Sequence, residues 1–171
     1  MGEFMQNENK AKHLIASKRF PMKNLLVINS YITIEAIEKS SVCSELIYLE
    51  FYKGYNRETK LPMTMDVMEL RGLYYACKEL YAKGETGYKN YTNPNLSSST
   101  NNNQGLKKLT IGQIEQSYEK SYILNLEISN DKREITFDKY SFLAFMDSLK
   151  VIADETETNF FKAQRQVAKK K

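Results

Sequence analysis

The stretch YITIEAIEKSSVCSELIYLEFY, residues 31–52, decides the fold because it recurs 77 positions later as KLTIGQIEQSYEKSYILNLEIS, residues 108–129. No gap is needed, and eight of the 22 aligned positions are identical. At an offset of 72 the match resumes, and LPMTMDVMELRGLYYACKEL (61–80) aligns with REITFDKYSFLAFMDSLKVI (133–152). The change of offset falls in the polar loop 53–58. Long self-similarity marks repeated structural units, so the sequence predicts two copies of one fold.

Alternation of apolar and polar residues predicts the strands of each copy. Residues 31–37 and 46–52 alternate, which is typical of strands with one buried face. The apolar run 25–29 is predicted as a buried strand. Residues 61–65 form a further strand, placed at an edge because Pro62 lacks a backbone donor. In the second copy the inward positions are Leu109, Ile111, Ile114, Leu124, Leu126, Ile128, Ile135 and Phe137.

Each copy ends in an amphipathic helix. Asp66 is a suitable N-cap for the first helix, and Gly84 is placed to end it in a left-handed conformation. Asp138 caps the second helix. The apolar stripes recur with helical spacing and are predicted to lie on the sheets. They comprise Leu70, Leu73, Tyr74, Cys77, Leu80 and Tyr81 in the first helix, and Phe142, Phe145, Leu149 and Ile152 in the second.

The predicted fold class is α+β. Two tandem ββ(β)β-α repeats form curved antiparallel sheets, each packed by a helix, within one pseudo-twofold domain. The segment 156–171 either continues the second helix or starts a short one, and it ends in a basic tail. The predicted boundaries are a cloning scar (MGEF) and flexible leader at 1–15, repeat I at 16–84, a polar flexible linker at 85–106, repeat II at 107–155 and the C-terminal segment at 156–171.

Composition argues against catalysis and cofactor binding. His13 is the only histidine, Cys43 and Cys77 form no CxxC motif, and there is no Gly-rich phosphate loop. We therefore predict a protein that is not an enzyme and that binds no metal or cofactor. Glu50 and Glu127 are identical across the repeat and could serve a metal-dependent nuclease, but a solvated or salt-bridged sheet face is the favoured interpretation.

The chain has no apolar run near the roughly 18–20 residues that a membrane span needs, so we predict no membrane partner. The two scattered cysteines indicate a reducing compartment and hence a cytoplasmic location, compatible with association with the nucleoid. A net charge of +4 favours an anionic partner only weakly. Its distribution is more informative, because basic residues cluster at Lys18, Arg19, Lys107, Lys108, Lys132 and Arg133.

Aromatic and basic residues meet on the outward face of the first copy. Tyr31, Tyr48 and Tyr52 share that face, and the adjacent hairpin loop supplies more candidates. Rings stack on unpaired bases while cations meet phosphates, and each stacked base contributes roughly 1–3 kcal/mol. Alternatively, outward tyrosines pack across strands or against a partner subunit. The loop candidates are Lys53, Tyr55 and Arg57.

This arrangement resembles the plan of Pur-alpha-like and Whirly proteins, and the related sheet-then-helix plan of positive cofactor four. ASKR at 16–19 resembles the lead-in to a Pur repeat, and KLPMTMDVMELRGLYYACKELYAKG at 60–84 resembles its last strand and helix. Members of these families bind single-stranded DNA or RNA across the sheet and neighbouring loops, and commonly dimerise or tetramerise. The resemblance implies contacts by Lys18, Arg19, Tyr48, Tyr52 and the loop 53–57.

The sequence therefore predicts a single-stranded DNA- or RNA-binding protein, acting in transcription or replication as a homodimer or higher oligomer. The alternative is a protein–protein assembly module that uses the same sheet face or the Phe160–Phe161 pair. Glu35, Glu50 and Glu127 favour this alternative, because outward carboxylates repel phosphates.

Overall fold

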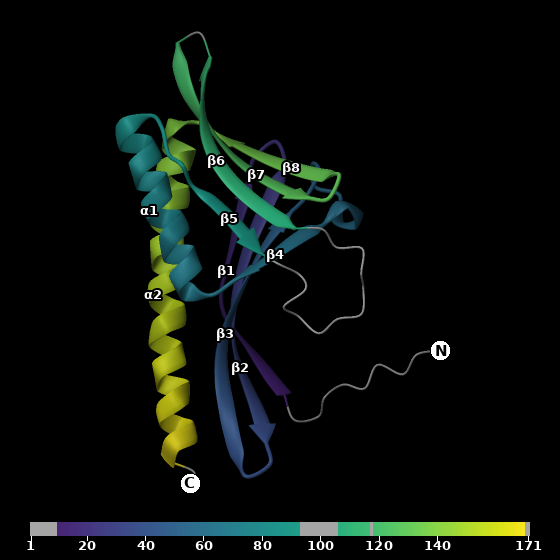
Figure 1. Cartoon of the computed structure of the whole chain (residues 1–171), viewed down its shortest axis with the longest axis vertical. Helices are drawn as coiled ribbons and strands as arrows, with labels where there is room; N and C mark the ends of the chain where they lie inside the picture. The colour runs from purple at the N-terminus through teal and green to yellow at the C-terminus, as the bar shows by residue number, and fades with distance from the viewer. Residues whose placement is uncertain (1–9, 93–105, 117, 170–171) are drawn as a thin grey trace.

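The computed structural model describes residues 10–92, 106–116 and 118–169, which form two four-stranded antiparallel sheets, each followed by a helix (Figure 1). This confirms the predicted α+β fold of tandem repeats. The first sheet has the order β1-β2-β3-β4, with β1 (Lys10–Pro21), β2 (Leu25–Ile37), β3 (Ser40–Phe51) and β4 (Leu61–Met65), and α1 (Val67–Lys83) follows it. The second sheet has the order β5-β6-β7-β8, with β5 (Lys89–Thr92), β6 (Lys107–Gln116), β7 (Glu119–Ile128) and β8 (Asp131–Phe137), and α2 (Lys139–Lys169) follows it.

The repeat in the sequence is also a repeat of the fold. The 77-residue offset places β2 on β6 and β3 on β7, and the 72-residue offset places β4 and α1 on β8 and the start of α2. The strand pairing is not identical. Ile34 opposes Cys43, whereas its counterpart Ile111 opposes Leu124 instead of Lys120. Because the shift is an even number of residues, each side chain keeps its face of the sheet.

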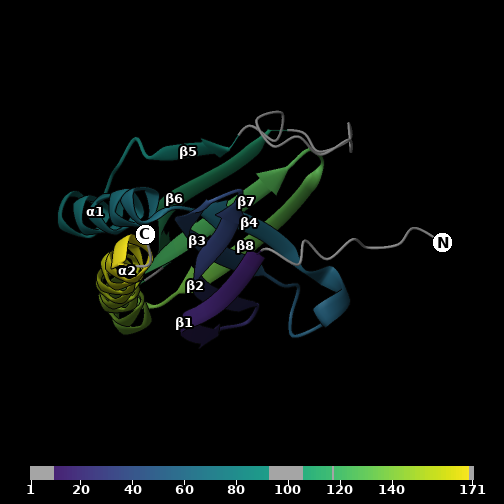
Figure 2. The ribbon, with the colours of Figure 1, turned by 90° about the horizontal axis from the view of Figure 1, so that it is seen from below.

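Each helix contacts the sheet of the other repeat. α2 packs on β1, β2 and β3, and α1 reaches β6. Phe145 of α2 lies with its ring centroid 5.2 Å from that of Phe20 in β1, and 4.8 Å from that of Phe137 at the end of β8. The two helices lie side by side next to the sheets (Figures 1 and 2). This crossing joins both repeats into one hydrophobic core.

The predicted helix ends and buried stripes are confirmed. Asp66 Oδ1 accepts a hydrogen bond from the Glu69 N–H at 2.7 Å, and Gly84 ends α1 with a φ of 78°. Asp138 caps α2 in the same way as Asp66 caps α1. Cys77 is fully buried, and burial raises the pKa of its thiol. The stripes lie in the core, where long apolar side chains leave water.

Several predicted boundaries differ from the structure. β1 begins at Lys10, so the predicted flexible leader is a strand from that residue on, and the proposed scar lies outside the described residues. Its pattern was hidden because an edge strand rich in lysine has little apolar alternation, and because a bulge between Leu14 and Ala16 breaks the period of two. Residues 25–29 and 31–37 form the single strand β2.

The predicted linker 85–106 contains a short polar edge strand, β5, at Lys89–Thr92, and residues 93–105 lie outside the described part. α2 is continuous for 31 residues, so the segment after residue 155 continues the helix, and the last two tail residues are not described. Ile114 is 36 % exposed, not inward, because its even position places it on the face opposite Leu109 and Ile111. Within the described ranges, no helix is both long and apolar enough to cross a membrane.

Candidate nucleic-acid interface

The outer face of the first sheet, away from the helices, carries two of the predicted tyrosines. Tyr31 on β2 and Tyr48 on β3 lie with ring centroids 5.8 Å apart and ring planes at 81°, an edge-to-face contact. Their neighbours Ile32, Ile47 and Leu49 point the other way and are buried. The predicted assignment of the two faces is therefore confirmed for this part of the sheet.

Lys12 of β1 completes this group. Its Nζ lies 4.1 Å from the Tyr31 ring centroid and 4.4 Å from the Tyr48 ring centroid, and it donates to Tyr48 Oη at 3.4 Å. A cation over an aromatic face is attracted by the ring quadrupole. We call Lys12, Tyr31 and Tyr48 the tyrosine–lysine cluster. Sequence reasoning missed Lys12, because it lies in the predicted leader; its alternation with Lys10 was the available signal of a charged edge strand.

Tyr52 lies on the same outer face but is not available for stacking. Its side chain is only 8 % exposed, and its hydroxyl donates to Glu50 Oε2 at 2.7 Å. Burial and this hydrogen bond raise the pKa of Tyr52 to about 12. Glu50 also lies 4.0 Å from the Lys60 ammonium, and Glu127 lies 3.7 Å from Lys108. Both glutamates thus form ion pairs, which agrees with the favoured interpretation of a solvated or salt-bridged sheet face.

Lys18 and Arg19 are both exposed, but strand alternation places them on opposite faces. Arg19 opposes Val27 and shares the face of the tyrosine–lysine cluster. Lys18 opposes the fully buried Ile28, so it lies at the edge of the face that the helices cover. Of this predicted pair, only Arg19 can act together with the tyrosines.

The loop between β3 and β4 meets the second repeat beside a cavity of about 240 Å³. Lys53 from the loop and Lys132 from the start of β8 both line it. Asn24 links the two repeats at this place. Its Nδ2 donates to the Glu134 carbonyl at 2.9 Å, and its Oδ1 accepts from the Gly54 N–H at 2.8 Å. The fold therefore brings together basic residues that are 79 positions apart in the sequence.

Arg133 and Lys107 form contacts between the two repeats. Both lie on the inner face of the second sheet, and Arg133 is only 8 % exposed. Arg133 Nε donates to the Thr59 carbonyl and Lys107 Nζ to the Pro62 carbonyl, each at 3.1 Å. Burial lowers the pKa of Lys107. These two cations hold the β3–β4 loop and β4 against the second repeat.

The remaining loop candidates are accessible. Tyr55 is 55 % exposed, and its hydroxyl donates to the Met22 carbonyl at 2.8 Å, which fixes the ring at the surface. Arg57 is exposed at the start of a short 3₁₀ turn, Arg57–Thr59, capped by the Asn56 side chain. Both residues therefore remain candidates for contact with a ligand that runs along the loop.

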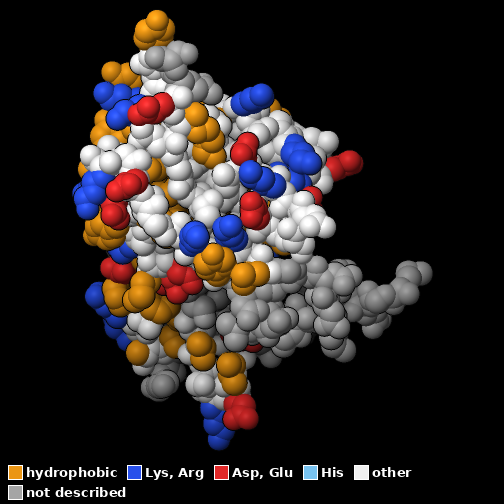
Figure 3. Space-filling model, turned by 45° about the horizontal axis from the view of Figure 1, so that its top comes forward, with side chains coloured by type: hydrophobic (Ala, Val, Ile, Leu, Met, Phe, Trp, Pro, Cys, Tyr) orange, Lys and Arg blue, Asp and Glu red, His pale blue; other side chains and the backbone are white. Residues whose placement is uncertain are grey.

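The outer face of the second sheet presents a further row of polar side chains. Tyr91 opposes Lys108, Lys108 opposes Glu127, and Glu127 opposes Lys132, across all four strands. Tyr91 is 49 % exposed and Lys89 is exposed on the same strand. Tyr91 was missed because it lies in the predicted linker. Figure 3 shows Lys and Arg side chains interspersed with Asp and Glu side chains on the face in view.

The same arrangement of sheets and helices occurs in three solved structures of Whirly proteins. The plant transcriptional regulator PBF-2 is 12 % identical, with a TM-score of 0.56 over 91 % of this chain and 87 % of that chain. WHY3 from Arabidopsis thaliana is 12 % identical, with a TM-score of 0.58 over 91 % of this chain and 97 % of that chain. WHY1 from Arabidopsis thaliana is 13 % identical, with a TM-score of 0.57 over 87 % of this chain and 92 % of that chain.

At these identities the likeness shows a shared fold, which supports the Whirly part of the predicted resemblance. The Pur-alpha-like and positive-cofactor-four-type parts are not confirmed. No protein-family model matches the chain, and its sequence matches no curated protein. Among residues 10–92, 106–116 and 118–169, no three His, Cys, Asp or Glu side chains gather as a metal site.

Proposed function

We propose that the protein binds single-stranded DNA or RNA along the outer face of its first sheet and the adjoining loop. The observation that carries this proposal is the tyrosine–lysine cluster, in which two partly exposed rings and an ammonium meet on one open sheet face. Aromatic rings stack on unpaired bases of any sequence, and lysine meets the phosphates between them. The fold shared with PBF-2, named as a transcriptional regulator, supports the proposal.

In this mechanism a base takes the place of the Lys12 ammonium against Tyr31 and Tyr48, and the displaced ammonium pairs with a phosphate. Arg19 lies further along the same face, and Lys53 and Lys132 follow at the junction of the repeats. The negative charge of Glu50 on this path is partly compensated by Lys60 and by the Tyr52 hydroxyl. The strand is bound without covalent chemistry and without base-edge readout.

A fluorescence-anisotropy titration tests this proposal. Labelled single-stranded DNA, single-stranded RNA and duplex of one length are compared at low and moderate salt. We expect tight single-strand binding that weakens steeply with salt, because neutralised phosphates release counterions, and weak duplex binding. The matched variants are Tyr31→Ala with Tyr48→Ala, and Tyr75→Ala as a control, since Tyr75 is 62 % exposed on α1. Equal affinities of wild type and the double variant would contradict the proposal.

A second candidate function is a protein–protein assembly module, and self-association as a homodimer or higher oligomer is part of our proposal. Large apolar side chains are exposed on both helices: Met68 (81 %), Tyr75 (62 %), Val151 (58 %) and Phe161 (49 %). Met68 and Tyr75 are seven residues apart and so lie on one face of α1, and exposed apolar groups that gather on one face favour a protein interface. Light scattering after size-exclusion chromatography, with and without single-stranded DNA, tests both the assembly-module function and self-association. A monomer at all concentrations would count against self-association.

A further inference from the structure

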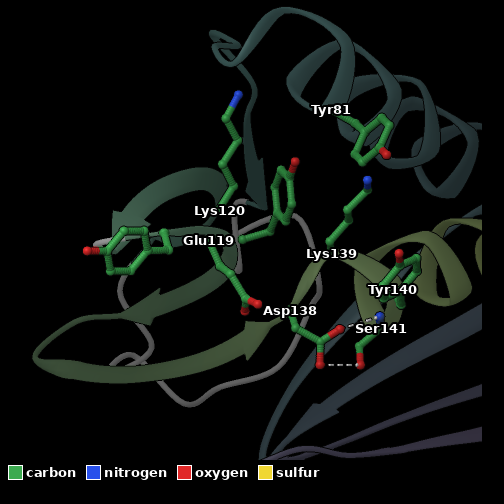
Figure 4. Close-up of a pocket in the computed structure, with 9 residues that line it drawn as sticks. Tyr81, Glu119, Lys120, Asp138, Lys139, Tyr140 and Ser141 are labelled. Carbon is green, nitrogen blue, oxygen red and sulfur yellow. Dashed lines mark hydrogen bonds between the residues drawn. The ribbon is translucent and has the colours of Figure 1, made fainter.

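A cavity of about 860 Å³ lies between the end of α1, the β6–β7 hairpin and the start of α2 (Figure 4). This volume is in the range of small-molecule sites. The cavity is separate from the interface proposed above. Tyr122 on its floor opposes Phe137 on the inner face of the second sheet, whereas Lys108 and Lys132 lie on the outer face.

The cavity lies beside the C-terminal end of α1, the shorter of the two helices. α1 ends at Gly84 after 17 residues, whereas α2 continues for 31 residues and covers the first sheet. At the equivalent place in the first repeat the position of Tyr122 is taken by Glu45, whose carboxylate accepts the Val67 N–H at 3.0 Å. The cavity is lined mainly by residues of the second repeat, and Tyr81 of α1 is the contribution of the first repeat.

Tyrosine rings form the floor and walls of the cavity. Tyr122 stacks on Phe142 with ring centroids 4.1 Å apart and planes at 5°, and the Tyr81 ring lies 6.0 Å from it. Tyr140 is 76 % exposed at the rim. Neither the Tyr81 nor the Tyr122 hydroxyl bonds to another residue that the structure describes. Burial raises the pKa of Tyr122, and the protonated hydroxyl is a hydrogen-bond donor.

Two lysines flank these rings without a carboxylate partner. Lys120 comes from the hairpin and Lys139 from the first residue of α2, and neither forms a salt bridge within the described ranges. Asp138 also lines the cavity and stays charged, but its two oxygens accept from the Ser141 N–H at 2.8 Å and the Ser141 hydroxyl at 3.0 Å and form no salt bridge with either lysine. Glu119 lies on the opposite side from Lys139 in Figure 4 and remains as a hydrogen-bond acceptor.

We propose that this cavity binds a nucleoside phosphate, because it places tyrosine rings, two lysines that form no salt bridge in the described part of the chain, and the Glu119 carboxylate around a single opening. The base lies against Tyr81 and Tyr140, the phosphate pairs with Lys120 and Lys139, and Glu119 accepts from a ribose hydroxyl or a base amino group. A ligand with an aromatic ring, hydroxyls and an anionic group provides a partner for the tyrosine rings, for Glu119 and for the two lysines. Free nucleotides and the phosphorylated end of a strand share this chemistry. The inference does not depend on the sheet-face interface.

Equilibrium dialysis of the full chain against labelled adenosine 5′-monophosphate, with adenosine as a second probe, tests this inference. We expect saturable binding of the monophosphate and weaker binding of adenosine. The Lys120→Ala, Lys139→Ala double variant loses about tenfold or more in affinity for the monophosphate, since it removes the charge-assisted hydrogen bonds to the phosphate. Lys78→Ala with Lys162→Ala removes the same charge elsewhere and keeps the affinity within about twofold of wild type.

No saturable binding of the monophosphate at millimolar concentration, or equal losses in the two double variants, would overturn the inference. Tyr140→Ala gives an independent check, because an exposed ring can be removed without disturbing the core. Competition by a 5′-phosphorylated oligonucleotide, but not by the same strand without the phosphate, identifies a strand end as the ligand. Tyr31→Ala with Tyr48→Ala leaves monophosphate binding unchanged, which separates failure of this site from failure of the sheet face.

Discussion

At the scale of single residues, the function rests on what surrounds Tyr31, Tyr48 and Tyr52. All three lie on one face, yet Tyr52 is buried and bonded to Glu50, whereas Tyr31 and Tyr48 keep part of their rings accessible. Lys12 is held over those two rings. A residue type at the right strand position is thus not sufficient for a contact, because its neighbours decide whether a ligand can reach it.

Tyr48→Ala and Lys12→Met should weaken single-strand binding in different ways. Loss of the Tyr48 ring removes stacking worth about 1–3 kcal/mol, so affinity falls roughly 5- to 150-fold at every salt concentration. Lys12→Met removes one phosphate partner, so the slope of log affinity against log salt falls by about one. Anisotropy titrations at several salt concentrations measure both effects. An unchanged slope in Lys12→Met would show that Lys12 does not meet a phosphate.

Tyr52→Phe should change stability and not binding. The substitution removes the hydrogen bond to Glu50 and costs about 1 kcal/mol in the free energy of unfolding at neutral pH. Because the pKa of Tyr52 is raised to about 12 in the folded state, its contribution is complete below pH 10 and is lost as the pH rises toward 12. Urea unfolding at neutral and alkaline pH checks this. A large loss of single-strand affinity in this variant would instead place Tyr52 in the interface.

At the scale of elements, the ends of the helices are set by single side chains. Asp138 accepts the Ser141 N–H and hydroxyl at the start of α2, and these bonds hold the pKa of its carboxyl below the usual value. Gly84 ends α1 in a left-handed conformation three residues after Tyr81, which lines the cavity beside the β6–β7 hairpin. Both helix ends therefore lie next to the cavity.

Asp138→Ala should destabilise the protein by about 1 kcal/mol at neutral pH, as expected for loss of an N-cap. Since the folded-state pKa of Asp138 is lowered, its contribution is present above its ordinary pKa and is lost as the pH falls through the folded-state value. The difference between wild type and variant therefore shrinks in acid. Urea unfolding at pH 7 and pH 3 measures it, with Asp147→Ala, an exposed residue of α2, as the control. A difference that does not change with pH would exclude the carboxylate as its source.

Elements with a strong pattern were predictable from the sequence, and those without one were not. The alternation in 31–37 and 46–52 and the caps at Asp66 and Asp138 led to the correct strands and helices. β1 and β5 were missed because polar edge strands bury few side chains and β1 contains a bulge. This error carried over to the site, since Lys12 and Tyr91 lie on those two strands.

At the scale of the whole molecule, the decisive feature is the exchange of helices between the repeats. The self-similarity of the sequence predicts two sheet-and-helix units, but a repeat does not specify which helix covers which sheet. In the structure Phe145 of α2 packs against Phe20 of β1, so α2 covers the first sheet. The covered inner faces share one core, whereas the outer faces and the basic junction at Lys53 and Lys132 remain accessible. The tandem plan alone therefore explains the elements but not the assembled site.

This exchange predicts that damage to α2 unfolds the first sheet. Phe145→Leu leaves a smaller side chain at a fully buried position, so we expect a loss of about 1–3 kcal/mol in the free energy of unfolding. Because Phe145 packs between Phe20 and Phe137, amide hydrogen exchange should become faster in β1–β3 and in β7–β8 together. Tyr140→Ala, a change at an exposed position of the same helix, serves as the control. Faster exchange confined to β5–β8 would mean that each repeat is stable by itself, contrary to the packing seen here.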